Sequence, residues 1–304
     1  MRAGLLIGTS GDPGDVPDEA RDAERLGFDL VAAGEHVFFH GPVANAFVTL
    51  AAAAAVTERI RLLSALTILP LYPMALAAKM TATLDRISHG RFGLGIGVGG
   101  EYRPEFRALG VPVADRGARA DEALDVLVRL LSGEKVTAEG RFGSLRDLRL
   151  DPLPVQQPRP PIWVGGRQAP AMRRAGRFAD VWMPYMVSPD SFARTLAGAR
   201  DFATQAGRPA TSLAGALFVW GCVGADPARA RRTAVDFVSG LYDQDFGPLA
   251  DRYLLHGDPD RIVARLAEFR AAGAETVIFA PACPPEQRAA MTALFAGEVV
   301  PRLA

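Results

Sequence analysis

The sequence predicts a (β/α)8 barrel with an insertion between its fourth and fifth strands. Short apolar runs alternate with longer helical patterns about eight times along the 304 residues. Such alternation favours a parallel sheet covered by helices, because parallel strands need crossover connections. No stretch divides the chain into halves, so a single domain over 1–304 is expected and the open, doubly wound sheet is the less favoured arrangement.

Each expected unit is an apolar strand followed by a helix. The strands are expected at 3–8, 28–33, 61–69, 91–98, 162–164, 179–183, 213–223 and 275–280. The helices that follow them are expected at 17–26, 46–57, 74–87, 115–131, 168–177, 189–206, 227–241 and 284–301, with an extra helix at 259–272. Between 134 and 161 the pattern is irregular and proline-rich, which indicates an inserted hairpin.

Composition limits the partners. Thirty-four basic and 34 acidic residues balance, so neither nucleic acid nor a membrane surface is expected, and a small-molecule substrate is. The two cysteines, Cys222 and Cys283, are too few for a disulfide framework, and no charged-then-apolar leader follows Met1. Together these features indicate a reducing cytoplasm. No apolar run reaches the roughly 20 residues that span a bilayer.

The strand at 91–98 contains three glycines, Gly93, Gly95 and Gly97. Glycine weakens a strand, so it indicates close approach, either of neighbouring strands or of a ligand lying against the backbone. The stretch 95–100 also matches G-x-G-x-x-G. A dinucleotide fingerprint leads directly into a helix, whereas a loop over 101–112 is expected here, so we reject that interpretation.

In a barrel of this kind, the chemistry lies at the carboxyl ends of the strands. Glu35 and His36 follow the second strand and are either an acid–base pair or structural residues. Gly165 and Gly166 precede a helix and form either an anion site at its amino end or a plain turn. The remaining histidines are scattered, and no spacing predicts a metal site.

Three stretches resemble a known family. They are LLSALTILPLYPMALAAKMTATLDRISHGRFGLGIGVGG at 62–100, PPIWVGG at 160–166 and RFADVWMPY at 177–185. Together they are similar to the bacterial luciferase-like superfamily of flavin- and deazaflavin-dependent oxidoreductases, over nearly the whole chain. Within it, the pattern most resembles the coenzyme F420-dependent oxidoreductases.

The resemblance implies a flavin-type ring across the strand ends, with its phosphate held by strands five and six. The cofactor is expected to be coenzyme F420, with FMN as the alternative. A non-proline cis peptide, expected at Ser64–Ala65, would back the ring. The residues that the resemblance assigns to cofactor binding are Ser64, Ala65, Thr67, Gly97, Gly99, Gly100, Gly165, Gly166 and Arg167.

The resemblance also assigns catalytic roles. His36 and Glu101 would transfer protons while hydride moves between the substrate and the deazaflavin. If FMN binds instead, the expected activity is monooxygenation with O₂ and an external reductase. A non-catalytic flavin-binding barrel is the alternative of another class.

Further expectations concern the surroundings of the cofactor. Arginines would hold the anionic tail of F420 unless they lie on a solvated helix face, namely Arg103, Arg107, Arg167, Arg173 and Arg174. Aromatic residues would line the substrate pocket unless they belong to the core, namely Phe38, Phe39, Tyr72, Tyr102, Trp182 and Tyr185. By resemblance, a homodimer would form through the helices around 46–56 and 75–84.

Overall fold

The computed structural model describes residues 1–8 and 12–303. Its barrel strands, in chain order, are β1 (Arg2–Ile7), β2 (Leu30–Ala33), β3 (Arg61–Ser64) continued by β4 (Thr67–Ile68), β5 (Phe92–Gly97), β8 (Ile162–Gly165), β9 (Val181–Met183), β10 (Ala214–Val223) and β12 (Ala274–Pro281). All of them pair in parallel, β12 with β1 and β10 with β9, so the sheet closes on itself. The predicted barrel is therefore confirmed, and the open-sheet alternative was wrong.

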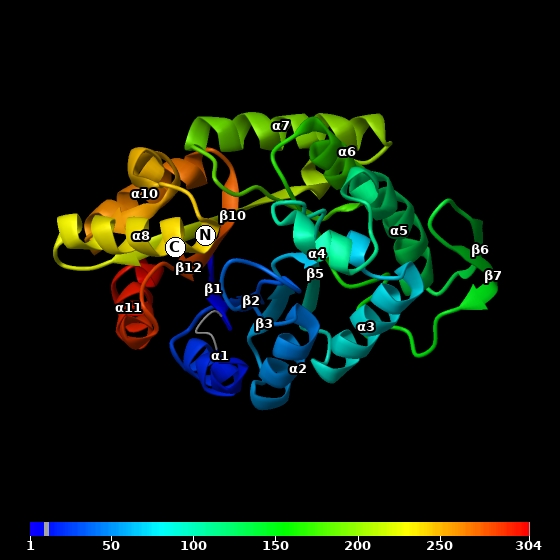
Figure 1. Ribbon diagram of the computed structural model, residues 1–304, viewed down its shortest axis with the longest axis horizontal. Helices are drawn as coiled ribbons and strands as arrows, with labels where there is room; N and C mark the ends of the chain where they lie inside the picture. The colour runs from blue at the N-terminus through cyan, green and yellow to red at the C-terminus, as the bar shows by residue number, and fades with distance from the viewer. Residues whose placement is uncertain (9–11, 304) are drawn as a thin grey trace.

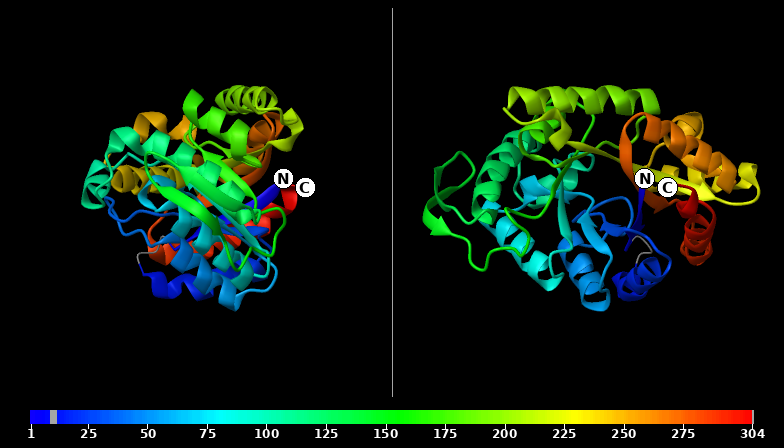
Figure 2. Two further views of the ribbon diagram at one scale, coloured as in Figure 1. Left: turned by 90° about the vertical axis from the view of Figure 1, so that its right-hand side faces the viewer. Right: turned by 180° about the vertical axis from the view of Figure 1, so that it is seen from behind.

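Helices surround the barrel (Figures 1 and 2). They are α1 (Val16–Arg25), α2 (Ala46–Val56), α3 (Met74–Ile87), α5 (Arg116–Leu131), α6 (Ala169–Phe178), α7 (Pro189–Gln205), α8 (Pro227–Tyr242), α10 (Pro259–Ala271) and α11 (Pro285–Glu298). Polar N-caps such as Asn45, Ser188 and Asp258 accept backbone hydrogen bonds at their starts, as their sequence positions favour. None of the described helices is long and apolar enough to cross a membrane.

Four shorter elements lie outside the alternation. β6 (Lys135–Glu139) and β7 (Ser144–Arg149) form an antiparallel hairpin that projects from one side of the barrel (Figure 1). β11 (Leu255–Gly257) extends the sheet beside β10, and the single-turn helix α9 (Ala250–Tyr253) precedes it.

The connection after β5 differs from the expectation. A loop was predicted over 101–112, but the segment contains a short helix, α4 (Arg103–Ala108). Pro104 lies in its first turn, where proline costs the helix no hydrogen bond. Its apolar face, with Phe106 fully buried, packs beside Ile68 and Val111. This packing holds α4 against the carboxyl end of β4.

Close approach of the neighbouring strand explains Gly95 of β5. A Cβ on Gly95 would lie 1.9 Å from the Ser64 carbonyl oxygen, and the Ser64 hydroxyl bonds both N–H and C=O of Gly95. Ala65 still donates to the Ala33 carbonyl at 2.7 Å. The ladder with β2 thus continues through residue 65, and the cis peptide lies at Ala65–Leu66. The predicted position, Ser64–Ala65, was wrong by one residue.

Candidate active site

A cavity of about 480 Å³ opens at the carboxyl ends of the barrel strands. Its volume falls within the range of small-molecule sites, and most of its lining is apolar. Of the residues predicted for the site, those that line the cavity are His36, Ala65, Gly97, Gly99, Glu101, Gly165 and Gly166. The barrel thus brings residues from four strand ends to one space.

Four predicted site residues do not line this cavity. Ser64 is fully buried between β3 and β5, and Thr67 is also fully buried. Thr67 Oγ1 has no hydrogen-bond partner in the part of the chain that the structure describes. Gly100 faces Arg116, whose Nε would lie 2.8 Å from an added Cβ. Arg167 lies outside the cavity wall, against the Tyr185 ring.

His36 is held by a carboxylate that sequence reasoning missed. Its Nδ1 lies 3.1 and 3.2 Å from the two carboxylate oxygens of Glu105, which is completely buried on α4. Glu105 also accepts from the Val37 backbone N–H at 3.1 Å. The His36 ring stacks on Phe39 at 4.1 Å between centroids. An Nδ1–H that donates to Glu105 leaves Nε2 as the free proton acceptor of a ring that lines the cavity.

Glu35, beside His36, is buried in a network of its own. It accepts hydrogen bonds from the Tyr72 hydroxyl at 2.7 Å, the Ile68 backbone N–H at 3.0 Å and the Asn45 amide at 3.2 Å. Burial, reinforced by the charge of Glu105, raises the pKa of Glu35 despite these donors. The network ties the start of α2 to the chain that follows β4 and fixes the segment bearing His36.

Glu101 is placed differently from Glu105. Its side chain is exposed at the cavity rim and accepts from the Tyr185 hydroxyl at 2.9 Å. Burial, and next the charge of Glu101, raise the pKa of Tyr185, which keeps that hydroxyl protonated. Glu101 makes no hydrogen bond to His36 among the described residues. The structure therefore gives three carboxyl groups near the cavity: Glu105 holds the histidine, Glu35 belongs to the network beside it, and Glu101 lies at the rim.

Leu66 forms the floor of the cavity. A Cβ added to Gly165 would lie 2.2 Å from Leu66 Cδ1, and one added to Gly97 would lie 3.3 Å from Leu66 Cβ. These glycines therefore make room for Leu66, which the break between β3 and β4 turns into the cavity. Leu66 thus presents an apolar side chain to the cavity, which suits contact with a planar ring.

The turn after β8 suits an anion. Gly166 has φ +135°, and a Cβ there would lie 2.5 Å from Ala171, so this position requires glycine. The N-cap residue of α6, Gln168, makes no side-chain capping bond. Pro170 has no N–H, and the Ala171 N–H donates to the Gln168 carbonyl at 2.9 Å. Of the first three helical residues, only Ala169 therefore keeps an N–H for an anion, beside the glycine turn that lines the cavity.

The aromatic lining differs from the expectation. Phe39 and Tyr185 line the cavity as predicted, whereas Trp182 lies in the core and Phe38 is exposed. Tyr72 is engaged with Glu35. The remaining aromatic lining comes from β10 and α8, which the sequence did not single out because their aromatic residues also fit a core pattern. These residues are Phe218, Trp220, Phe237 and Tyr242.

The predicted arginine cluster is divided. Arg174 is buried and donates to Asp121 at 2.7 Å, so it is not available at the cavity mouth. Arg173 lies over the Phe202 ring. Arg103 and Arg107 are exposed on α4, the element that also bears Glu105.

The described residues contain no preformed metal site. No group of three or more histidine, cysteine, aspartate or glutamate side chains there is arranged to hold a metal ion. The available chemistry in the cavity is proton transfer by His36 and the carboxyl groups, together with binding of a planar, anionic molecule.

Comparison with known proteins identifies the family. The model of the luciferase-like monooxygenase family matches residues 1–276. The chain belongs to this family. An uncharacterized protein of Mycobacterium tuberculosis, Rv0940c, and its counterpart Mb0965c of Mycobacterium bovis are each 35% identical over 176 residues, or 58% of this chain. The matched stretch spans only 60% of the length of each of these relatives.

Several solved structures share the fold. The monooxygenase RslO1 from Streptomyces bottropensis is 26% identical, with a TM-score of 0.88 and 100% of both chains covered. An F420-dependent secondary alcohol dehydrogenase, bound to an F420–acetone adduct, is 21% identical with a TM-score of 0.88, covering 100% of this chain and 99% of the other. The oxygenating constituent of 3,6-diketocamphane monooxygenase from Pseudomonas putida, bound to FMN, is 21% identical with a TM-score of 0.77, covering 99% and 98%.

Proposed function

We propose that this protein is an oxidoreductase that transfers hydride between coenzyme F420 and a small organic substrate. The observation that supports this most directly is the position of His36, which is held by the buried Glu105 at the edge of an apolar cavity. A structural neighbour with the same fold is F420-dependent. The substrate is an uncharged molecule, because the cavity presents few polar groups besides those of the site.

The cavity fits a flavin-type ring. The ring would lie on Leu66, and the phosphate would meet the turn at Gly165 and Gly166. When bound, the deazaflavin supplies the acceptor or donor of hydride. The protein positions this ring and excludes water with an apolar wall that includes Phe218 and Trp220.

His36 supplies the proton transfer. With Nδ1–H donated to Glu105, Nε2 accepts the proton of a substrate hydroxyl as the adjacent C–H bond is broken, and returns it in the reverse direction. The positive charge that His36 gains is stabilised by Glu105. Glu101 and Tyr185 lie at the rim, where they would orient the substrate.

Binding of the two cofactors tests the proposal. Trp220 lines the cavity, so F420 bound there should quench tryptophan fluorescence in a saturable manner. Purified protein is titrated with F420 and with FMN, each oxidised and reduced. Preferential binding of F420 is expected. Preferential binding of reduced FMN, followed by O₂ consumption, would instead favour the monooxygenase alternative, which the 26% identity to RslO1 supports. Binding of either cofactor without turnover of alcohols, aldehydes or ketones would indicate a non-catalytic barrel.

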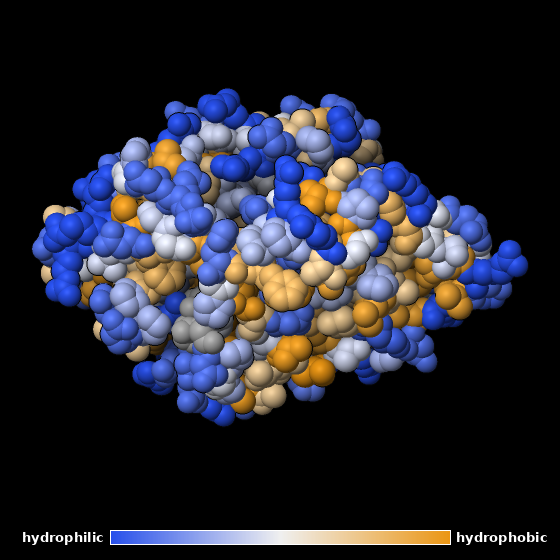
Figure 3. Space-filling view, in the orientation of Figure 1, coloured by the Kyte–Doolittle hydropathy of each residue, from blue (hydrophilic) through white to orange (hydrophobic). Residues whose placement is uncertain are grey.

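The proposal includes a homodimer formed through α2 and α3. Val48 on α2 is 69% exposed, and Leu76 and Ile87 on α3 are 49% and 46% exposed. Apolar side chains gather over these helices in Figure 3. A second copy of this surface would cover them. Sedimentation equilibrium measures the assembly, and a monomer at micromolar concentration contradicts this part of the proposal.

A further inference from the structure

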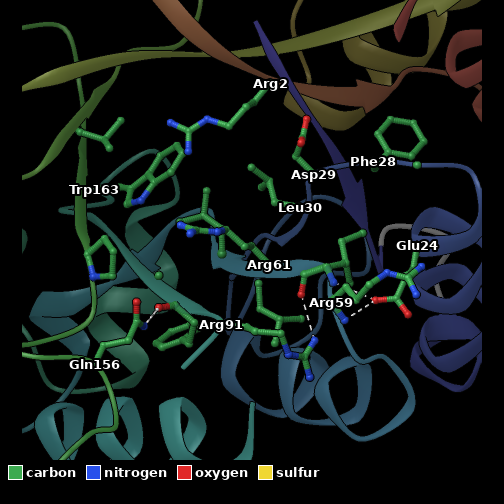
Figure 4. A pocket seen from close by; sticks show the side chains of 18 residues that line it. Arg2, Glu24, Phe28, Asp29, Leu30, Arg59, Arg61, Arg91, Gln156 and Trp163 are labelled. Atoms are coloured by element: carbon green, nitrogen blue, oxygen red, sulfur yellow. Dashed lines mark hydrogen bonds between the residues drawn. The ribbon is translucent and has the colours of Figure 1, made fainter. Parts of the chain in front are cut away.

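A second pocket, of about 560 Å³, opens at the amino ends of the barrel strands (Figure 4). It lies at the opposite end of the barrel from the proposed active site, and the two share no lining residue. Its lining combines charged side chains with apolar residues near the starts of the strands, including Leu30, Leu62 and Phe92. Active sites of such barrels occupy the other end, so the proposed function does not explain this pocket.

Two guanidinium groups in this pocket have no protein acceptor. Arg2 begins β1 and Arg61 begins β3. Neither side chain makes a hydrogen bond or ion pair with any residue that the structure describes. Figure 4 shows both extending toward Trp163, away from the acidic side chains of Asp29 and Glu24. Each guanidinium carries five N–H donors and a permanent charge.

Of the other charged groups of the pocket, Arg59 also makes no side-chain hydrogen bond to a described residue, and its positive charge helps to lower the pKa of Glu24. The remaining charged groups have partners. The Arg91 guanidinium donates to four backbone carbonyls and to the Thr57 hydroxyl, near the ends of α2 and α3. Glu24 accepts from the backbone N–H groups of Glu58, Arg59 and Ile60. Asp29 accepts from the Ala3 N–H at 2.7 Å. Both carboxylates therefore accept hydrogen bonds from backbone N–H groups, and neither forms an ion pair with Arg2 or Arg61.

Trp163 adds a third donor. Its side chain is 8% exposed and lines the pocket, with Nε1 3.4 Å from where a Cβ on Gly93 would stand. No hydrogen bond to Nε1 occurs within the described ranges. The Trp163 N–H is not among the described buried polar atoms that lack a partner, so it is open to the pocket and can donate to a ligand. Three donors without acceptors thus converge beside an apolar and aromatic surface.

From this arrangement we infer that the amino-end pocket binds a small organic anion, whose carboxylate or phosphate group is held by Arg2, Arg61 and the Trp163 N–H. Guanidinium groups match the oxygens of both anions through paired, charge-assisted hydrogen bonds. The apolar body of the ligand lies against Leu30, Leu62 and the Trp163 ring. A molecule with a single anionic group on a planar apolar body matches this combination.

Isothermal titration calorimetry with benzoate as the probe tests the inference. Benzoate binds with one site per chain, whereas benzamide, which has nearly the same shape but no charge, does not saturate. Phenyl phosphate, titrated in parallel, shows whether the site prefers the phosphate. The R61Q variant binds benzoate about tenfold more weakly or worse, as expected for loss of a charge-assisted hydrogen bond. W163F, which keeps an aromatic ring without the N–H, weakens binding by about threefold or more.

The controls separate this site from the rest of the molecule. R146Q removes an exposed arginine on β7 that makes no bond to the described residues, and it leaves benzoate affinity unchanged. Thermal melting of R61Q verifies that it remains folded. The inference is overturned if neither anion binds, if benzamide binds equally well, or if folded R61Q retains the affinity. The comparison of R61Q with the wild type is informative even if neither F420 nor FMN binds to the protein. Its outcome is therefore independent of the proposed function. Competition between benzoate and either cofactor would place benzoate in the other cavity and also overturn it.

Discussion

Glu24 and Glu35 lie at opposite ends of the same barrel, and their carboxyl groups are held in opposite ways. Glu24, at the amino end, accepts from three consecutive backbone N–H groups, which outweigh burial and lower its pKa. Glu35, at the carboxyl end, is more deeply buried, and burial raises its pKa although it too accepts hydrogen bonds. The same side chain is thus kept ionised at one end and pushed toward its neutral form at the other.

This difference extends to the neighbouring groups. At the carboxyl end, the buried Glu105 is paired with His36, so the charge and the proton acceptor form one unit. At the amino end, the acidic groups are occupied by the backbone, and Arg2 and Arg61 have no acceptor in the described part of the chain. The first arrangement suits proton transfer, and the second suits anion binding. Substitutions at each end test whether the two ends are as distinct as their charges indicate.

The largest expected effect is that of His36→Ala. Loss of the proton acceptor should lower turnover by about 100-fold or more, while the affinity for F420 stays within about twofold, because Leu66 and the turn after β8 remain. Steady-state kinetics and fluorescence titration measure the two quantities. His40→Ala is the matched control, since His40 is exposed in the same segment. Equal turnover in His36→Ala and the wild type would exclude the proposed role.

Glu105→Gln should have a smaller effect. Glutamine keeps the size of the side chain but removes the charge that stabilises protonated His36, so kcat should fall about tenfold with little change in KM. Glu105 acts through His36 and is a positioning residue, so the split between kcat and KM is the informative measurement. Glu101→Gln, at the rim, is the comparison, and a change confined to KM is expected there. A larger loss of kcat in Glu101→Gln than in Glu105→Gln would return the catalytic role to Glu101.

The difference between Glu101 and Glu105 also shows what the sequence could predict. The barrel followed from the alternation of apolar and helical patterns, which local periodicity encodes. Seven predicted site residues line the cavity because strand ends converge in any such barrel. Glu105 was missed because its segment was taken for a loop. Pro104 followed by Phe106 is compatible with the start of a helix. A helix of only six residues, however, is too short to show a clear period in its apolar residues.

Other features depended on tertiary contacts. Ser64 and Thr67 were predicted to bind the cofactor, yet both side chains point away from the cavity into the packing between strands. The direction of these side chains depends on where the pairing of β2 with β3 ends. A shift of one residue in that pairing would turn them to the opposite face of the strand. The pocket around Arg2 and Arg61 was not foreseen either, because an exposed arginine looks the same in sequence whether solvated or facing a pocket.

The smallest expected effect is on the pH dependence of stability, and it distinguishes the carboxyl groups of Glu24 and Glu35. A raised pKa means that protonated Glu35 favours the folded state, so its contribution to stability is full below the ordinary value of 4.5 and is lost as pH rises through the raised value. For Glu24, whose pKa is lowered, the contribution is present above 4.5 and is lost as pH falls through the lowered value. The Tm of the wild type minus that of Glu35→Gln should therefore fall as pH rises, by about 1–3 °C. The Tm of the wild type minus that of Glu24→Gln should instead rise, by about 1–3 °C. Melting curves of the three proteins from acidic to neutral pH measure this, and parallel trends for the two variants would show that the two ends hold their carboxyl groups alike.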